Sequence, residues 1–147
     1  MDEEHNSPIR VLTVDDHAAF RQGMALFVGS ETGMQVVAEA ANGREAVEQF
    51  RKHRPDITLM DLQMGTMNGI DAITAIRGEF PEARIIVLTT YSGDVRLIRA
   101  FQAGAWGYVL KGLVAKNLLA TVRSVHAGEK RISPEIAAQI AGDTDED

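Results

Sequence analysis

The stretch IRVLTVDDH, residues 9–17, joins a run rich in β-branched residues to two aspartates and a histidine. Four further short apolar runs follow it along the chain of 147 residues. The five strand candidates are IRVLTV from Ile9, MQVVAEA from Met34, ITLM from Ile57, RIIVLTT from Arg84 and GYVL from Gly107. Their starts lie 25, 23, 27 and 23 residues apart, which leaves room in each interval for one strand, one helix and two short turns. This spacing predicts repeated βαβ units around a parallel sheet.

Helices are expected on both faces of this sheet. Residues 85–88 (IIVL) are apolar at four consecutive positions, as in strands that are buried on both sides. Apolar residues at helical spacing, such as Phe20 and Met24, separate the strands. The predicted fold class is therefore α/β, a doubly wound five-stranded parallel sheet. Ser133 as an N-cap with Pro134 at the first helical position predicts a short extra C-terminal helix.

The composition suits one globular domain, with 45% apolar and 24% charged residues. Because there are no cysteines, disulfide scaffolds, cysteine-ligated metal centres and thiol catalysis are excluded. The longest apolar runs fall far short of the ~20 residues that a membrane span needs. The N-terminus, MDEEHNSPIR, lacks the apolar segment of a secretory signal. We expect a cytoplasmic protein without a membrane partner.

The net charge of −6 comes mainly from the two ends of the chain. Residues 5–142 contain 15 basic and 14 acidic residues, so the body of the chain is nearly neutral. The composition therefore gives no sign of the basic footprint of a nucleic-acid-binding domain. The terminal acidic residues are Asp2, Glu3, Glu4, Asp143, Asp145, Glu146 and Asp147.

Polar residues follow four of the five predicted strands. Asp15 and Asp16 follow the first strand, Asp61 the third and Lys111 the fifth, while Thr89 ends the fourth. Ligands of open α/β sheets bind at the carboxyl ends of the strands, so these five residues are expected to share one rim. Taken singly, each has an ordinary explanation, such as a helix cap, a turn former or a solvated charge. Their coincidence at one edge favours a functional site.

Three neighbouring carboxylates repel one another, and each raises the pKa of the others unless a cation is present. Mg²⁺ suits such a site, because it prefers oxygen ligands and bridges carboxylates to phosphate. Aspartate is also a covalent acceptor of phosphoryl groups. The rim therefore predicts Mg²⁺-dependent phosphoryl chemistry, in which the protein positions groups and neutralises charge.

The segments IRVLTVDDH, DLQMGTMNGI, IIVLTT and AWGYVLKG, in this order, resemble the receiver domain of bacterial two-component response regulators. The resemblance covers residues 8–131, between an acidic N-terminal tail (1–7) and a linker helix with an acidic tail (132–147). It implies a flavodoxin-like sheet in the order 2-1-3-4-5. The stretch from Ala103 to Ile140 is similar to the NarL/LuxR-type subclass.

The resemblance implies roles for the rim residues. Asp61 would accept a phosphoryl group from a sensor histidine kinase. Asp16 would bind Mg²⁺ directly and Asp15 through water, and the backbone carbonyl of Gln63 would complete the protein ligands. Lys111 would pair with the phosphoryl group. The domain would assist its own phosphorylation and dephosphorylation without being an enzyme in the ordinary sense.

Further positions concern switching and phosphate lifetime. Thr89 would hydrogen-bond the phosphoryl group, and Tyr108 would change rotamer as Thr89 moves. Gln63 and Tyr91 would tune the hydrolysis of the acyl phosphate. Two glycines depart from the commonest family pattern, in which proline is usual four residues after the acceptor and just after the lysine. These are Gly65 and Gly112, which are expected to affect loop dynamics and not the chemistry.

The resemblance also implies an output surface, built from the fourth helix, the fifth strand and the fifth helix. Phosphorylation is expected to control homodimerisation and a helix-turn-helix DNA-binding domain, for which the 16 residues after Arg131 are too few. We expect an excised receiver ending in its linker, with a stand-alone regulator as the alternative. The candidate readout residues are Val95, Arg96, Arg99, Tyr108 and Lys116.

Two other classes of protein compete with this interpretation. A Mg²⁺-dependent aspartyl-phosphate phosphatase usually has a second carboxylate two residues after its nucleophile, where this chain has Gln63. A flavodoxin-like nucleotide or flavin binder would have a Gly/Ser/Thr-rich loop after its first strand. The sequence DDHAAF (residues 15–20) instead offers carboxylates, which repel phosphate unless a metal intervenes. The receiver interpretation is preferred.

Overall fold

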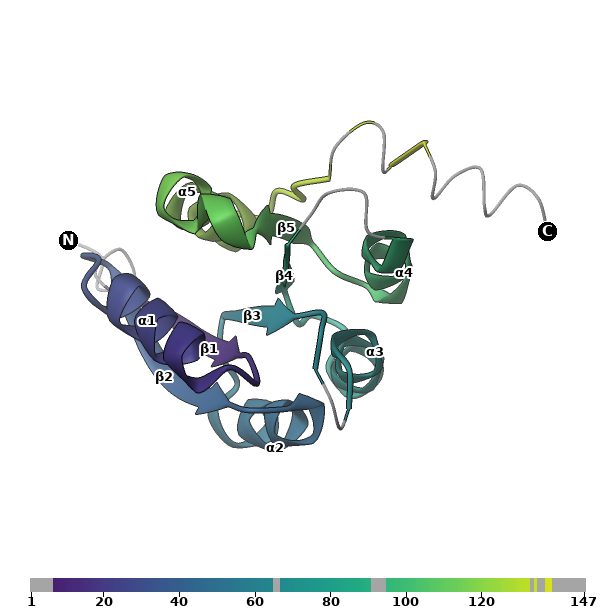
Figure 1. Ribbon diagram of the computed structural model, residues 1–147, viewed down its shortest axis with the longest axis horizontal. Coiled ribbons are helices and arrows are strands. Elements are labelled where there is room, and N and C mark those ends of the chain that lie inside the picture. The colour runs from purple at the N-terminus through teal and green to yellow at the C-terminus, as the bar shows by residue number, and fades with distance from the viewer. Residues whose placement is uncertain (1–6, 65–66, 91–94, 133, 135–136, 139–147) are drawn as a thin grey trace.

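The computed structural model describes residues 7–64, 67–90, 95–132, 134 and 137–138. Its centre is a five-stranded sheet in the order β2-β1-β3-β4-β5, with every neighbouring pair parallel (Figure 1). The predicted doubly wound, flavodoxin-like sheet is confirmed. The strands are β1 (Ile9–Val14), β2 (Met34–Ala40), β3 (Ile57–Asp61), β4 (Ile85–Thr89) and β5 (Gly107–Leu110).

Helices cover both faces of the sheet, with α1 and α5 on one face and α2, α3 and α4 on the other (Figure 1). Successive residues of β4 alternate between the two cores, so Ile86 and Leu88 pack with α1 and α5, whereas Ile85 and Val87 pack with the other three helices. This explains why β4 is apolar along its length. The helices are α1 (Ala18–Gly29), α2 (Gly43–His53), α3 (Gly69–Glu79), α4 (Val95–Ala103) and α5 (Val114–His126), with a 3₁₀ turn, η2 (Lys111–Leu113).

Successive strands are added on one side of β1 up to β2 and on the other side from β3 onward, so the order of strand addition reverses between β1 and β3. This switch point places the acidic residues together. The register pairs Val14 with Met60, so the next residues along the two strands, Asp15 and Asp61, meet at the same edge. Open α/β sheets bind ligands at such a reversal point. The topology thus brings together residues that lie 46 positions apart in the sequence.

The chain continues along the sheet edge after α5. Arg131 forms an isolated parallel bridge with Gly107, and its N–H donates to the Trp106 carbonyl at 2.8 Å. No pattern in the sequence predicted this contact. The extra helix predicted from Ser133 lies largely outside the described residues. Within the described part of the chain, no helix has the length and apolar character required to cross a membrane.

Replacing Gly69 by alanine is expected to destabilise the fold. A Cβ there would collide with the Asp61 carbonyl oxygen and lie 2.9 Å from the Leu62 Cα, both of which are backbone atoms. We expect a loss of about 1–3 kcal/mol in the free energy of unfolding, measured by urea denaturation. Gly78→Ala is the matched control in the same helix, because a Cβ there meets nothing within 4 Å. It should raise stability by up to about 1 kcal/mol. Equal effects of the two variants would contradict this account.

Candidate acidic and phosphoryl-accepting site

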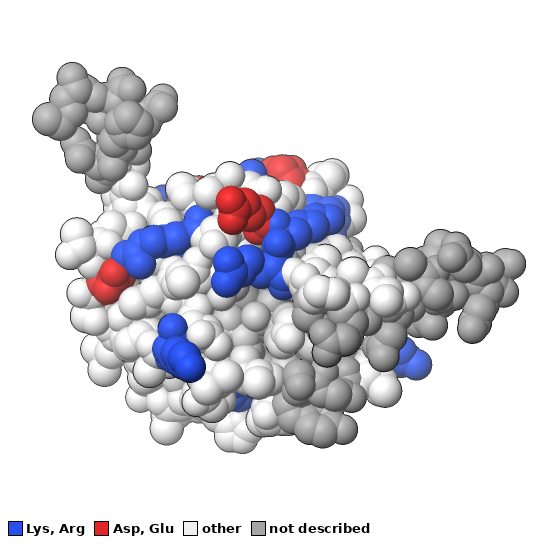
Figure 2. Space-filling view, turned by 90° about the horizontal axis from the view of Figure 1, so that it is seen from above, with Lys and Arg blue, Asp and Glu red and all other residues white. Residues whose placement is uncertain are grey.

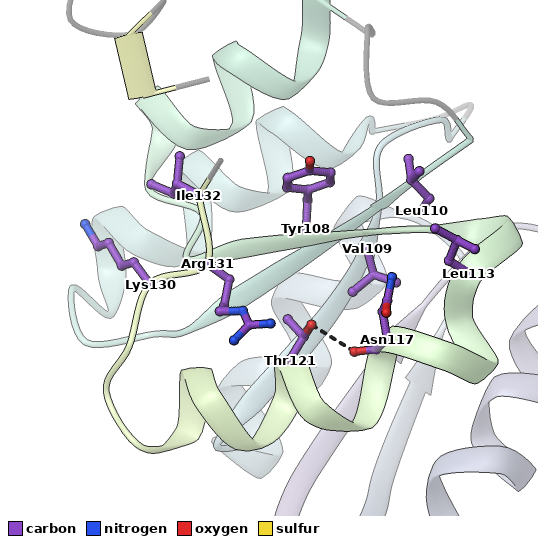
Figure 3. Close-up of a pocket in the computed structure, with 9 residues that line it drawn as sticks. All are labelled: Tyr108, Val109, Leu110, Leu113, Asn117, Thr121, Lys130, Arg131 and Ile132. Carbon is purple, nitrogen blue, oxygen red and sulfur yellow. Dashed lines mark hydrogen bonds between the residues drawn. The ribbon is translucent and has the colours of Figure 1, made fainter. Parts of the chain in front are cut away.

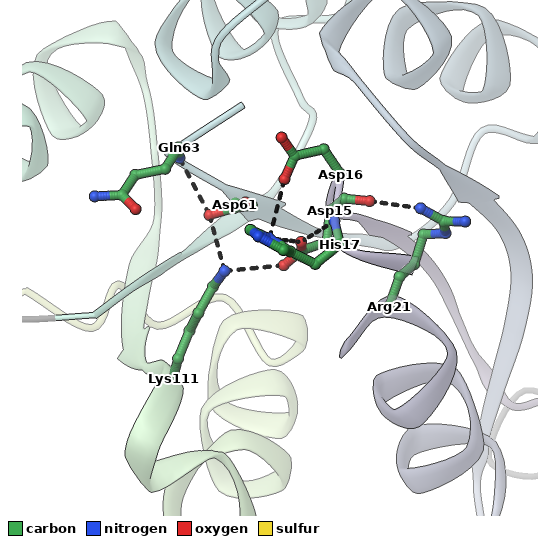
Figure 4. A network of polar contacts seen from close by, with 7 residues as sticks. All are labelled: Asp15, Asp16, His17, Arg21, Asp61, Gln63 and Lys111. Atoms are coloured by element: carbon green, nitrogen blue, oxygen red, sulfur yellow. Dashed lines mark hydrogen bonds and ion pairs between the residues drawn. The ribbon is translucent and has the colours of Figure 1, made fainter. Parts of the chain in front are cut away.

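Four potential metal ligands gather at the carboxyl ends of β1 and β3 (Figure 4). Asp15, Asp16, His17 and Asp61 each offer a ligand atom, and these atoms lie within 4.8 Å of one another. Asp15 and Asp61 are buried, with exposed fractions of 2% and 1%, whereas Asp16 and His17 are exposed. The structure therefore brings together the three carboxylates predicted from sequence and adds a histidine.

Lys111 is the cation of this cluster. Its Nζ lies 3.0 Å from Asp15 Oδ2 and 3.2 Å from Asp61 Oδ1, and 4.8 Å from the centre of the Phe20 ring. Burial lowers the pKa of Lys111, but the two carboxylates outweigh this effect and raise it above its usual value. The ammonium group therefore stays charged and bridges the two buried aspartates.

Asp61 has one satisfied and one unsatisfied carboxylate oxygen. Oδ1 accepts the backbone N–H of Gln63 at 3.1 Å and faces Lys111, whereas Oδ2 is buried without a hydrogen-bond donor among the described residues. Burial raises the pKa of Asp61, the Gln63 N–H lowers it, and the charge of Asp15 raises it further. The outcome is a raised pKa despite Lys111. Asp61 is thus a desolvated carboxylate with a free lone pair.

Asp15 is held by both its backbone and its side chain. Its N–H donates to Ala40 in β2 at 3.1 Å, and its carbonyl accepts from Arg21 at 2.7 Å. Its Oδ1 accepts the His17 N–H at 2.8 Å, which closes a turn just before α1. The N-cap of α1 is His17, which makes no side-chain capping bond. Asp16 therefore does not cap this helix.

Of six other predicted positions near the site, four are described by the structure and two are not. Thr89 is buried at the end of β4, in register with Leu110, which precedes Lys111. Tyr108 is half-buried on β5 and packs edge-on against Phe101, with ring centres 6.2 Å apart. Two predicted positions lie outside the described residues, namely Gly65 and Tyr91. Gln63 and Gly112 are described, and both are exposed.

Tyr108 also borders a pocket of about 450 Å³ that is separate from the acidic cluster (Figure 3). The pocket lies between β5, α5 and residues 130–132, and Thr121 on its wall donates to the Asn117 carbonyl. A movement of Tyr108 would therefore reach the segment that follows α5.

Residues 11–123 match the model of the family described as the response regulator receiver domain. The chain belongs to this family. Its relatives include the response regulator protein VraR of Staphylococcus aureus, which is 36% identical over 132 residues, or 90% of this chain. The chain spans 63% of the length of that curated relative.

Solved structures support the same assignment to the receiver family. A LuxR-family two-component response regulator from Aurantimonas is 38% identical, with a TM-score of 0.82 over 94% of this chain and 99% of the other. The receiver domain of NarL from Mycobacterium tuberculosis is 28% identical, with a TM-score of 0.79 over 84% of this chain and 99% of the other. The predicted family and its NarL/LuxR-type kinship are confirmed.

Sequence reasoning did not select His17 as a member of the site. The signal was present, since a metal-ligating residue type directly follows the two aspartates. The Gln63 N–H contact was also missed, because it depends on the backbone path after β3 and not on the type of residue.

Asp61→Asn is expected to stabilise the fold at neutral pH. Folding raises the pKa of Asp61. The wild type therefore loses stability as the pH rises from the pKa of this group in the unfolded chain, about 4, through its pKa in the folded chain. The variant lacks this loss, so its advantage should reach about 1–3 kcal/mol at pH 7 and shrink toward pH 4. Denaturation across this pH range, without divalent ions, measures the difference. Asp71→Asn removes an exposed carboxylate and should change stability by less than about 0.5 kcal/mol. If Asp61→Asn gained the same free energy of unfolding at every pH, the raised pKa of Asp61 would not be the cause.

Proposed function

We propose that this chain is the phosphorylation-controlled receiver of a two-component regulator, with Asp61 as its phosphoryl acceptor. The observation that carries the proposal is the buried Oδ2 of Asp61, which has no hydrogen-bond donor in the described structure. The other oxygen of the same carboxylate, Oδ1, lies 3.2 Å from Lys111 Nζ, and two further carboxylates belong to the same cluster. Such an oxygen keeps a lone pair available for attack on phosphorus. The donor is a phosphohistidine of a sensor kinase.

In the transfer, Asp61 Oδ2 forms a bond to phosphorus while the bond from phosphorus to the histidine nitrogen breaks. The leaving imidazole takes up a proton from solvent, and an aspartyl phosphate remains on the chain. Lys111 neutralises charge on the phosphoryl oxygens, and Thr89 hydrogen-bonds one of them. The receiver thus supplies positioned charge and a nucleophile, and it is chemically altered by the reaction rather than turning over like an ordinary enzyme.

The acidic cluster has the donor set that Mg²⁺ prefers. The cluster holds the carboxylates of Asp15, Asp16 and Asp61. In the proposal Asp16 and Asp61 bind Mg²⁺ directly, Asp15 binds it through water, and the backbone carbonyl of Gln63 completes the protein ligands. One ammonium group faces the two buried carboxylates, so the site accommodates further positive charge. When bound, Mg²⁺ supplies electrostatic stabilisation of the transferring phosphoryl group.

Output is proposed to use the face formed by α4, β5 and α5. Residues 95–132 contain seven basic residues and one acidic residue, Glu129. Figure 2, seen from the side on which α5 lies in Figure 1, shows mostly Lys and Arg among the charged side chains of that face. Val95, Arg99 and Lys116 are exposed on these helices. Tyr108 connects this face to the acceptor through Thr89, and Gln63 and Tyr91 tune the lifetime of the phosphate.

At the level of the whole protein, we propose phosphorylation-dependent homodimerisation and control of a DNA-binding domain beyond residues 8–131. The support comes from relatives of the LuxR family, of which one is 38% identical. The alternative of a stand-alone regulator uses the same acceptor chemistry. A phosphatase function has less support, because the exposed Gln63 stands where a general acid is required.

Phosphoramidate with Mg²⁺ is expected to add one phosphoryl group to the wild-type chain. Asp61→Asn should abolish the adduct because the amide is a poor nucleophile, and Asp71→Asn should retain it. Intact-mass spectrometry of the three proteins gives the answer directly. A wild type that stays unmodified under saturating donor would exclude Asp61 as an acceptor, and an adduct on Asp61→Asn would place the acceptor elsewhere.

Beryllofluoride, a mimic of the aspartyl phosphate, is expected to shift the monomer–dimer equilibrium toward the dimer. The added charge draws Thr89 and Lys111 toward Asp61, and Tyr108 then turns inward and reshapes the output face. Sedimentation velocity across a concentration series measures the shift. An unchanged distribution, with adduct formation confirmed by mass or fluorine NMR, would show that this chain signals without dimerising.

A further inference from the structure

His17 lies against the acidic pair in a way that its sequence position alone does not require. Its Nδ1 is 3.2 Å from Asp16 Oδ1 and 3.4 Å from Asp15 Oδ1, and the side chain is 75% exposed (Figure 4). The turn closed by the His17 N–H and Asp15 Oδ1 holds the imidazole at the mouth of the site. The ring therefore faces both the carboxylates and solvent.

These separations fit donors that share one metal ion. Two donors bound at about 2.1 Å and at right angles lie about 3.0 Å apart, and donors on opposite sides of the ion lie about 4.2 Å apart. All ligand atoms of Asp15, Asp16, His17 and Asp61 lie within 4.8 Å of one another, so small side-chain movements bring them to these values. The buried Asp61 Oδ2, without a hydrogen-bond donor, is an independent sign that a cation belongs here.

An imidazole nitrogen changes the metal preference of an oxygen site. Mg²⁺ favours carboxylates, carbonyls and water, whereas Co²⁺, Ni²⁺ and Zn²⁺ bind imidazole well. A site with three carboxylates and one imidazole therefore discriminates among divalent ions in a way that an all-oxygen site does not.

We propose that His17 is a metal ligand of this chain and sets the metal specificity of the acidic site, giving imidazole-preferring divalent ions an advantage over Mg²⁺. The inference rests on the proposed function only in placing a cation beside Asp61. It predicts that the resting receiver binds Ni²⁺ or Zn²⁺ more tightly than Mg²⁺ and that His17 supplies a large part of the difference. Such ions would compete with Mg²⁺ for the acceptor site.

The competing explanation, in which His17 is only a cationic or hydrogen-bonding neighbour of the aspartates, predicts no loss of metal affinity when His17 is removed. Removing a competing cation would leave the affinity for every divalent ion unchanged or raise it. Removing a ligand lowers the affinity for Ni²⁺ and leaves that for Mg²⁺ nearly unchanged. The two explanations are therefore separable by one substitution.

The test is calorimetric titration of the full chain with Ni²⁺ and, separately, with Mg²⁺ at one fixed pH of about 8. His17→Ala is expected to weaken Ni²⁺ binding at least about tenfold and to change Mg²⁺ binding by less than about threefold. His126→Ala is the matched control, since it removes an exposed histidine outside the cluster and should change neither. Equal or stronger Ni²⁺ binding by His17→Ala would overturn the proposal.

A spectroscopic readout identifies the ligand atom. In protein with ¹⁵N-labelled histidine side chains, saturating Zn²⁺ should move the His17 Nδ1 resonance to the range of metal-bound imidazole. The His126 resonances should stay in place. An unmoved His17 resonance, while calorimetry shows that Zn²⁺ is bound, would also overturn the proposal. Both measurements are made without a phosphodonor, so a failure of Asp61 phosphorylation is detected separately.

Discussion

The site depends on the burial of two carboxylates, Asp15 and Asp61, at the ends of adjacent parallel strands, with the single ammonium group of Lys111 between them. Burying like charges together is unfavourable unless opposite charge and hydrogen bonds compensate. The compensation comes from three separate parts of the chain, namely the end of β5, the turn before α1 and the backbone after β3. The site therefore exists only when the whole sheet is assembled.

The packing around Asp61 leaves little freedom to its backbone. The first residue of α3, Gly69, lies against the Asp61 carbonyl, and the N–H of Leu62 donates to Leu88 of β4 at 3.2 Å. β3 is buried along its whole length between the two cores. A rigid strand end holds the carboxylate in place, so the chemistry depends on small movements of side chains and not on movement of the sheet.

Ligands of open α/β sheets bind at the carboxyl ends of the strands, and this was enough to predict that Asp15, Asp61 and Lys111 lie together. The edge of a parallel sheet is set by its topology, and the topology follows from the spacing of the apolar runs. His17 and the Arg131 bridge escaped prediction for a different reason. The position of His17 follows from a local turn closed by an aspartate side chain, and that of Arg131 from an open sheet edge that exists only after folding. Neither of these two contacts produces a repeating pattern of apolar residues that could be recognised in the sequence. The family roles of Thr89 and Tyr108 came from resemblance, since a buried threonine and a half-buried tyrosine are common in any α/β sheet.

The unsatisfied oxygen of Asp61 gives the site its responsiveness. It costs stability in the resting chain, because a buried acceptor without a donor forgoes the hydration it would have in the unfolded state. Any group that brings positive charge or hydrogen-bond donors to this oxygen stabilises the folded form by mass action. A site with all its hydrogen bonds satisfied would gain less from a metal ion. The unsatisfied oxygen that weakens the fold therefore makes the site sensitive to a cation, and Lys111, shared between two carboxylates, can shift its interaction to a new anion without crossing the sheet.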